Sequence, residues 1–249
     1  MTPCVRRRSA ADMLDPAMTL GDVVTSHPAL ARELERRGLD YCCRGDRSLA
    51  DACAERELDL ATTIGELRAV AATTGGEAPV WASMDVGDLV DHLEATHHRY
   101  LWGELPRLSA LADKVVAVHG DRHPELRDVR RRFEELRAEL EPHLAKEERV
   151  LFPMIRQSVA SRASATIQWL GPPISVMLAE HDRAGALLAE LRRLTDGYRP
   201  PPDDCASYRA CYAALADLEA DTHLHVHKEN NLLFPAVVRL REQVLGVLS

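Results

Sequence analysis

The sequence contains the same short motif twice, and this repeat constrains the fold more than any other feature. A histidine is followed four residues later by a glutamate and then by Leu-Phe-Pro, first over residues 143–153 and again over 225–235. A further histidine precedes each copy at nearly the same distance, at His97 or His98 in the first case and at His181 in the second. A repeat of this length indicates two related helix pairs within one architecture.

On an α-helix, residues four apart lie on one face, so each repeat places an imidazole beside a carboxylate. These pairs are His143 with Glu147 and His225 with Glu229. Apolar residues continue both faces at the helical period: Phe133, Leu136, Leu140, Val150 and Met154 in the first helix, and Leu215, Leu218, Leu232 and Ala236 in the second. His181 falls in a third stripe, made by Ile174, Met177, Leu178 and Leu188. The proline after each pair is expected to bend or end its helix.

Long helical patterns dominate the second part of the chain. We expect four helices, over residues 85–112, 124–157, 172–196 and 205–244, joined by segments that contain the glycine and proline typical of connections. No segment predicts a strand, and the low aromatic content of 4% disfavours a β-sandwich or barrel. The fold class is therefore all-α, with a four-helix bundle as its main part.

The best linker in the chain is the segment 73–79, which reads Thr-Thr-Gly-Gly-Glu-Ala-Pro. It divides the chain into a small helical domain at 19–76 and the bundle at 80–245, with residues 1–18 expected to form a flexible tail. The small domain carries a turn-like Asp-Tyr-Cys-Cys segment at 40–43.

Charge and hydropathy disfavour two classes of partner. The net charge of −8 argues against a general nucleic-acid binder. No apolar run approaches the roughly 18 residues that span a membrane. No apolar segment follows the arginines at 6–8, as it would in a secretory signal, so a cytoplasmic location is expected. The sequence does not determine the oligomeric state, and a homodimer is one of the options it leaves open.

A bundle core that receives three histidines and two glutamates predicts a metal site. Burying two carboxylates without partners is costly, and a cation held between facing helices resolves that cost. Imidazole and carboxylate ligands suit iron, manganese or zinc, and two shared carboxylates suit a pair of metals better than one. The adjacent His97 and His98 cannot both face the core, and periodicity does not choose between them. The alternative is a bundle with scattered polar histidines.

Several motifs together resemble the iron–sulfur cluster repair di-iron proteins, the RIC family of the YtfE and ScdA type. The resemblance covers about residues 19 to 240 and rests on the Asp-Tyr-Cys-Cys segment at 40–43, both repeats, and the Gly-Pro-Pro-Ile-Ser-Val-Met segment that begins at 171 and leads to Glu-His-Asp at 180–182. It implies a haemerythrin-like four-helix bundle behind an N-terminal ScdA-type domain.

The resemblance also implies a non-haem di-iron centre: two iron ions, joined by an oxo bridge. Its histidine ligands would be His98, His143, His181 and His225, and its bridging carboxylates Glu147 and Glu229. The family pattern thus selects His98, while His97 stands where other members carry a tyrosine. Family members protect or restore iron–sulfur clusters after nitric oxide or oxidative damage. Damaged iron–sulfur proteins are therefore the expected partners, and nitric oxide or dioxygen the expected small ligands.

Three functions are compatible with these features. They are cluster repair by iron delivery or nitric oxide handling, a haemerythrin-like oxygen or nitric oxide sensor without turnover, and a nitric oxide reductase. The Tyr-Cys-Cys domain disfavours a plain oxygen carrier, which would need only the bundle.

Four further residues are candidates for functional roles outside the set of metal ligands. Glu139 and Glu180 could be outer-shell acids or steps on an iron exit path, or simply solvated helix charges. Cys42 and Cys43 could be redox-active or nitrosyl-accepting thiols, as the resemblance hints. They could also be ligands of an iron or cluster, or a turn with small side chains.

Overall fold

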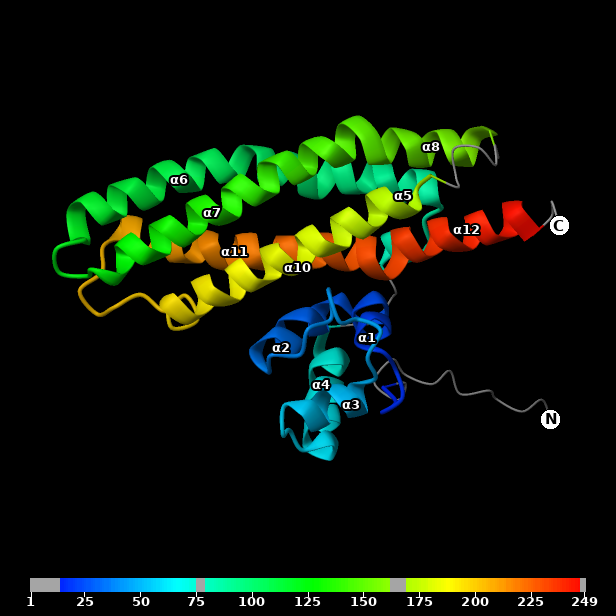
Figure 1. Ribbon diagram of the computed structural model, residues 1–249. Helices are drawn as coiled ribbons and strands as arrows, with labels where there is room; N and C mark the ends of the chain where they lie inside the picture. Colours follow the sequence, from blue (N-terminus) through cyan, green and yellow to red (C-terminus); the bar gives the residue numbers. More distant parts are fainter. Residues whose placement is uncertain (1–13, 75–78, 162–168, 247–249) are drawn as a thin grey trace.

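The computed structural model describes residues 14–74, 79–161 and 169–246. Figure 1 shows a long helical bundle with a small helical domain packed against one side. The described residues form no β-strand, and their one isolated β-bridge joins Thr19 to Ser48. The all-α expectation is confirmed.

The bundle is built from helices that meet along their apolar stripes. Its helices are α5 (Val86–Leu93), α6 (Arg99–His119), α7 (Glu125–Lys146), α8 (Phe152–Ser161), α10 (Gly171–Leu194), α11 (Ala206–Lys228) and α12 (Phe234–Gly246). Helix α7 packs against α6 and α10, and α11 packs against α6 and α10, so the four longest helices close a square. The first long helix continues past residue 112, because Val115 and His119 extend its buried stripe.

Three π-helical turns, Glu94–His98, Glu147–Leu151 and Glu229–Leu233, interrupt these long helices. In the second and third, the amide of the following phenylalanine donates to the glutamate carbonyl five residues earlier. A proline comes next in both, and it would clash with the carbonyl four residues before it in a regular helix. The wider π turn accommodates the proline, and the helix continues.

The second and third π turns also correct the sequence-based core assignment. The extra residue shifts the register by one position, so the residues expected inside after each repeat are not the ones buried. Val150 is 51% exposed, whereas Leu151 and Phe152 are buried. Likewise Leu233 and Val237 are buried in place of the expected Leu232 and Ala236. The periodicity argument failed because it assumed an uninterrupted α-helix.

The small domain consists of α1 (Leu20–Ser26), a 3-10 turn (Pro28–Leu30), α2 (Ala31–Arg36), α3 (Leu49–Glu55) and α4 (Leu60–Thr74). The hydroxyls of Thr19 and Ser48 cap α1 and α3 by accepting hydrogen bonds from backbone amides. The flexible tail expected over residues 1–18 ends before residue 14. Leu14 is buried in this core, and the Leu49 amide donates to the Met18 carbonyl at 2.8 Å. Residues 1–13 lie outside the described residues.

The small domain docks on α11 and on the π turn that follows it. Val226 of α11 packs into the core of the small domain. The Asn231 side-chain amide donates to the backbone carbonyls of Tyr41 and Cys42, both at 3.2 Å. The Tyr41 ring meets the buried His227 ring edge-on, with centroids 5.6 Å apart. These contacts fix the 41–45 segment against the bundle.

Gly45→Ala is expected to disturb this docking. A Cβ at position 45 would overlap both the Asn231 side-chain oxygen and the Tyr41 carbonyl, and the carbonyl cannot rotate away. Overpacking of this kind costs about 1–3 kcal/mol. Hydrogen–deuterium exchange should become faster in peptides from this interface. The matched control is Gly65→Ala, where a Cβ meets nothing within 4 Å. Equal exchange in both variants would contradict the close approach.

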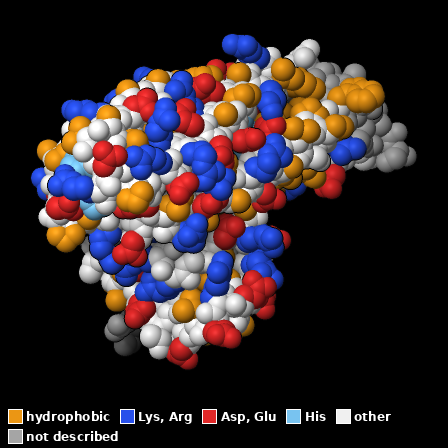
Figure 2. All heavy atoms as spheres, turned by 60° about the vertical axis from the view of Figure 1, so that its left-hand side comes forward, with side chains coloured by type: hydrophobic (Ala, Val, Ile, Leu, Met, Phe, Trp, Pro, Cys, Tyr) orange, Lys and Arg blue, Asp and Glu red, His pale blue; other side chains and the backbone are white. Residues whose placement is uncertain are grey.

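The surface of the bundle is mostly charged. No helix among the described residues is both long and apolar enough to cross a bilayer. Figure 2 shows acidic and basic side chains interspersed along the bundle, with apolar side chains gathered toward one end. Exposed apolar residues on the bundle helices include Val159 of α8 and Val238 of α12.

Candidate metal centre

The six candidate ligands predicted from the sequence converge inside the bundle, and all six are buried: His98, His143, Glu147, His181, His225 and Glu229. They form two groups whose ligand atoms lie within 4.8 Å of one another. One group takes His98 and His225, the other takes His143 and His181, and both include Glu147 and Glu229. The two carboxylates therefore lie between two pairs of imidazoles.

The local fold explains this convergence. Glu147 and Glu229 each open a π turn, and His98 closes one. His143 and His225 lie one turn before the glutamates, on α7 and α11. The site sits between two apolar clusters, one around the α6–α7–α11 contacts and one around α5, α8 and α12. This location keeps water away and strengthens electrostatic interactions within the site.

The carboxylates are held ionised against the cost of burial. For Glu229, burial raises the pKa, but the neighbouring His225 and His181 outweigh it and hold the pKa well below its usual value. For Glu147, burial and the Glu229 carboxylate both raise the pKa. The imidazoles of His143 and His98 more than compensate, so the pKa is again lowered.

Two of the imidazoles, those of His143 and His98, have a raised pKa. Burial lowers the pKa of His143, yet the Glu147 carboxylate overcomes this and raises it to about 9. The pKa of His98 is also raised, because Glu147 outweighs burial there too. Protons on these imidazoles therefore balance the buried negative charge, and a bound cation would take over that role.

Several polar atoms in this cluster are buried without a hydrogen-bond partner among the described residues. They are His98 Nε2, both carboxylate oxygens of Glu147, Glu229 Oε2 and His225 Nδ1. The Nε2 atoms of His143 and His181 face each other at 3.2 Å. A cluster of imidazoles and carboxylates with several unsatisfied polar atoms fits a cation better than a hydrogen-bond network. The residues present therefore fit a metal pair.

Three of the imidazoles form a hydrogen bond through Nδ1, the ring nitrogen that points away from the cluster. His143 Nδ1 donates to Glu180 at 2.9 Å, and His98 Nδ1 donates to Glu148 at 3.0 Å. His181 Nδ1 donates to the Asn230 side-chain oxygen at 2.8 Å. Such partners fix the tautomer that leaves Nε2 free toward the metal.

Glu148 and Asn230 are supporting residues that the sequence reasoning missed. Each directly follows a bridging-glutamate candidate, so they occupy the same position in the two repeats. Each supports a histidine on a different helix, His98 in one case and His181 in the other. The repeat itself was the signal that could have identified them.

Glu180 and Glu139, the two outer acids singled out from the sequence, are placed differently. Glu180 is buried and contacts both His143 and the Lys146 ammonium group. Glu139 is partly exposed, pairs with Arg183 at 3.2 Å, and lines a narrow cavity beside His143 and His181. Only Glu180 touches a candidate ligand.

His97 lies outside both ligand groups but is buried beside one of them. Its ring stacks on His225 with centroids 5.4 Å apart. Its Nδ1 donates to Asp221 at 2.8 Å, and its Nε2 accepts from the Lys228 ammonium at 2.7 Å. Burial lowers the pKa of His97 to about 4, so the ring is neutral. His97 therefore supports the centre from behind His225.

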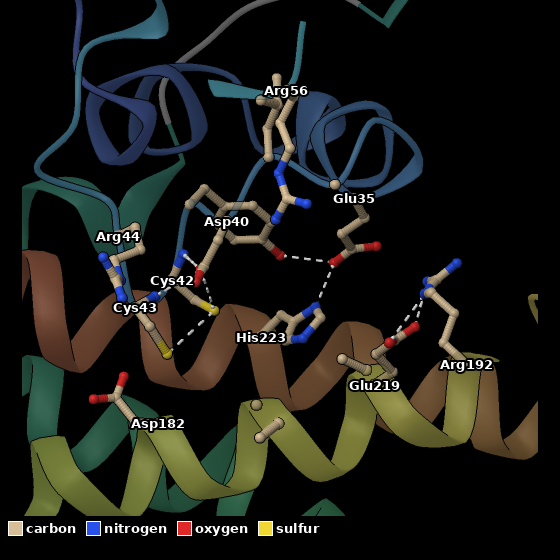
Figure 3. Close-up of a pocket in the computed structure, with 16 residues that line it drawn as sticks. Glu35, Asp40, Cys42, Cys43, Arg44, Arg56, Asp182, Arg192, Glu219 and His223 are labelled. Atoms are coloured by element: carbon tan, nitrogen blue, oxygen red, sulfur yellow. Dashed lines mark hydrogen bonds and ion pairs between the residues drawn. The ribbon is translucent and has the colours of Figure 1, made fainter. Parts of the chain in front are cut away.

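Cys42 and Cys43 lie outside the metal cluster, at the junction of the two domains (Figure 3). Their sulfur atoms are 3.8 Å apart, and the Asp40 carboxylate accepts from both backbone amides. With Asp40 they form a third group of potential ligand atoms within 4.8 Å. The Asn230 amide donates to the Cys42 carbonyl at 3.2 Å, so one side chain joins this segment to His181.

Comparison with known protein families matches two separate segments of the chain. Residues 88–237 match the family model described as the hemerythrin HHE cation binding domain. Residues 16–71 match a second model, named for the N-terminal domain of ScdA and described only as a domain of unknown function. The bundle is thus a cation-binding domain by family.

The chain is also similar over most of its length to individual proteins. The iron-sulfur cluster repair protein YtfE from Escherichia coli O81 (strain ED1a) is 36% identical over 219 residues, which cover 87% of this chain and 94% of that protein. A protein of the same name from Escherichia fergusonii matches to the same extent. The resemblance inferred from the motifs is confirmed.

Proposed function

Because this chain belongs to the hemerythrin HHE family and, within it, to the iron–sulfur cluster repair proteins, we propose that it repairs clusters damaged by nitric oxide or oxidative stress. It does so with a non-haem di-iron centre in the bundle. One iron would be held by His98 and His225, the other by His143 and His181. Glu147 and Glu229 would bridge the two.

The observation that carries this proposal is the pair of overlapping ligand groups with shared carboxylates. Iron held by two imidazoles and two shared carboxylates would keep open positions for nitric oxide or dioxygen and could be given up to an acceptor. The chain's own residues orient the ligands: Glu180, Glu148 and Asn230 each hold an imidazole from outside. A damaged iron–sulfur protein would receive the iron as cargo.

The docked small domain favours repair over plain oxygen carriage. Asn230 contacts His181 on one side and the Cys42 carbonyl on the other. The thiol segment therefore lies one side chain away from a candidate ligand. A simple carrier of a small ligand requires no second domain at this position.

The direct experiment purifies the protein without chelators, measures metals by mass spectrometry and assays reactivation of an enzyme whose cluster was damaged by nitric oxide. We expect about two irons per chain, as in other bundle di-metal sites, together with reactivation. Failure to bind iron after anaerobic reconstitution would remove the di-iron proposal. Iron binding without reactivation would instead favour the sensor.

Glu180→Gln is expected to weaken iron retention about tenfold or more, because it removes the charged partner of His143 Nδ1. Glu190→Gln is the matched control, since Glu190 lies on the same helix as Glu180, pairs with Arg132 and contacts none of the six candidate ligands. Iron loss to a chelator, followed by absorbance, measures both variants. Equal loss rates in the two would contradict the supporting role of Glu180.

A further inference from the structure

A cavity of about 500 Å³ lies between the small domain and helices α10 and α11 (Figure 3). It is separate from the metal cluster, since none of the six candidate ligands lines it. Its volume is in the range of pockets that bind small organic molecules. Cys42 and Cys43 lie at one end, between Arg44 of the small domain and Asp182 of α10.

Three charged side chains of this cavity have neither an ion pair nor a side-chain hydrogen bond among the described residues: Arg44, Arg56 and Asp182. The other charges that line it already have partners. The Asp40 carboxylate accepts from the backbone amides of Cys42 and Cys43. Glu35 accepts from His223 and Tyr41, and Glu219 accepts from Arg192. The cavity therefore offers two guanidinium groups and one carboxylate to a ligand. Figure 2 shows basic side chains gathered where the small domain meets the bundle.

The two thiols differ in their access to the cavity. Cys42 is 6% exposed, and its hydrogen bond to Cys43, its burial and the Asp40 carboxylate raise its pKa well above the usual value. Cys43 is partly exposed, and its sulfur lies close to Gly185 of α10 at the cavity wall. Cys43 is therefore the thiol that a ligand can reach, and Cys42 lies behind it.

We propose that this cavity binds a small cysteine-type thiol, an amino acid or short peptide with carboxylate and ammonium groups, and exchanges disulfides with it at Cys43. Arg44 and Arg56 would hold the carboxylates, since guanidinium–carboxylate hydrogen bonds are strong and directional. Asp182 would hold the ammonium group. This inference concerns the thiol cavity alone and does not depend on the proposed iron chemistry.

The exchange step conserves the number of disulfide bonds. The Cys43 thiolate attacks one sulfur of the ligand's disulfide, that disulfide breaks, and a new bond joins Cys43 to one half of the ligand. The other half leaves as a thiolate and takes up the proton that Cys43 released. The disulfide form of the ligand is the oxidant. The Cys42 sulfur lies 3.8 Å from that of Cys43 and can attack the mixed disulfide in a second, slower step, because its raised pKa keeps it mostly protonated. Its proton passes to the released half, which leaves as a thiol, and a bond forms between Cys42 and Cys43.

The test compares two disulfides on the full-length protein: glutathione disulfide, which carries carboxylates and ammonium groups, and the neutral bis(2-hydroxyethyl) disulfide. Mass spectrometry of the intact protein follows adduct formation, and peptide mapping locates it. We expect Cys43 to react about tenfold faster with glutathione disulfide than with the neutral reagent. Cys42→Ser should let the adduct accumulate, and Cys43→Ser should abolish it.

Charge variants make the test specific. Arg44→Met and Arg56→Met should each slow the reaction with glutathione disulfide several-fold and leave the neutral reagent unaffected. Arg36→Met is the matched control, because Arg36 lies on the same domain, does not line the cavity and pairs with Glu33. Equal rates for the two disulfides, or an adduct at Cys205 instead of Cys43, would overturn the proposal. Iron content, measured in parallel, tests the metal centre independently.

Discussion

Glu229→Gln is expected to lower the bound iron from about two per chain to less than one and to abolish cluster repair. Glu229 belongs to both ligand groups, so a single substitution affects both metal positions. Glutamine has nearly the same shape, but its amide nitrogen donates hydrogen bonds and cannot coordinate a cation. Its neutral side chain also fails to balance His181 and His225, which face it at 3.1 Å. Metal analysis and the reactivation assay measure the loss.

Two further variants separate this effect from misfolding. His225→Ala removes a ligand of only one group, so it should retain more iron than Glu229→Gln. Glu190→Gln makes the same chemical change on α10 outside the site, where Glu190 pairs with Arg132, and should keep normal iron. A folded Glu229→Gln protein with full iron and full activity would refute the bridging assignment.

The repeat was sufficient to predict that each histidine lies beside its glutamate, because its spacing acts locally. Four residues make one turn, so His143 and Glu147 had to share a face whatever their surroundings. The assignment of a buried core failed immediately after each glutamate, where Val150 is exposed. That failure has one physical cause, the π turn, whose hydrogen bond to the Glu147 carbonyl no α-helical period anticipates.

The choice between His97 and His98 shows a second limit. Both side chains are buried, so burial alone would not have separated them. They differ in their partners: His98 faces Glu147 at 3.4 Å, whereas His97 binds Asp221 on α11. Both partners lie on other helices, dozens of residues or more away in the sequence, so they depend on helix packing, which a local pattern does not encode.

The docking of the small domain was not predictable from the chain. The sequence predicted two domains and a Tyr-Cys-Cys segment but gave no relation between them. The contacts that place this segment run from backbone carbonyls to Asn230 and Asn231. Backbone acceptors have no sequence signature, so the thiol cavity could be recognised only from the folded arrangement.

Removing the metal is expected to lower the thermal unfolding temperature by about 10 °C. A ligand present at about a thousand times its dissociation constant stabilises the folded state by about 4 kcal/mol. For a chain of this size, each kcal/mol of stability changes the unfolding temperature by about 2–4 °C. Calorimetry before and after chelation measures the difference. Glu229→Gln, which should bind little metal, serves as the control and should not respond to the chelator.

The difference in unfolding temperature between the metal-bound and the metal-free protein should grow with pH, because protons partly replace the cation in the metal-free protein. The folded pKa of His143 is raised from 6.5 to about 9 by Glu147, so its proton stabilises the metal-free state fully below about 6.5. That contribution is lost as the pH rises through about 9, whereas the metal-bound state carries no such proton. The metal-free protein should therefore become less stable over this interval while the loaded protein changes little. A shift that stays constant over the same pH range would show that protons and metal do not compete for these imidazoles.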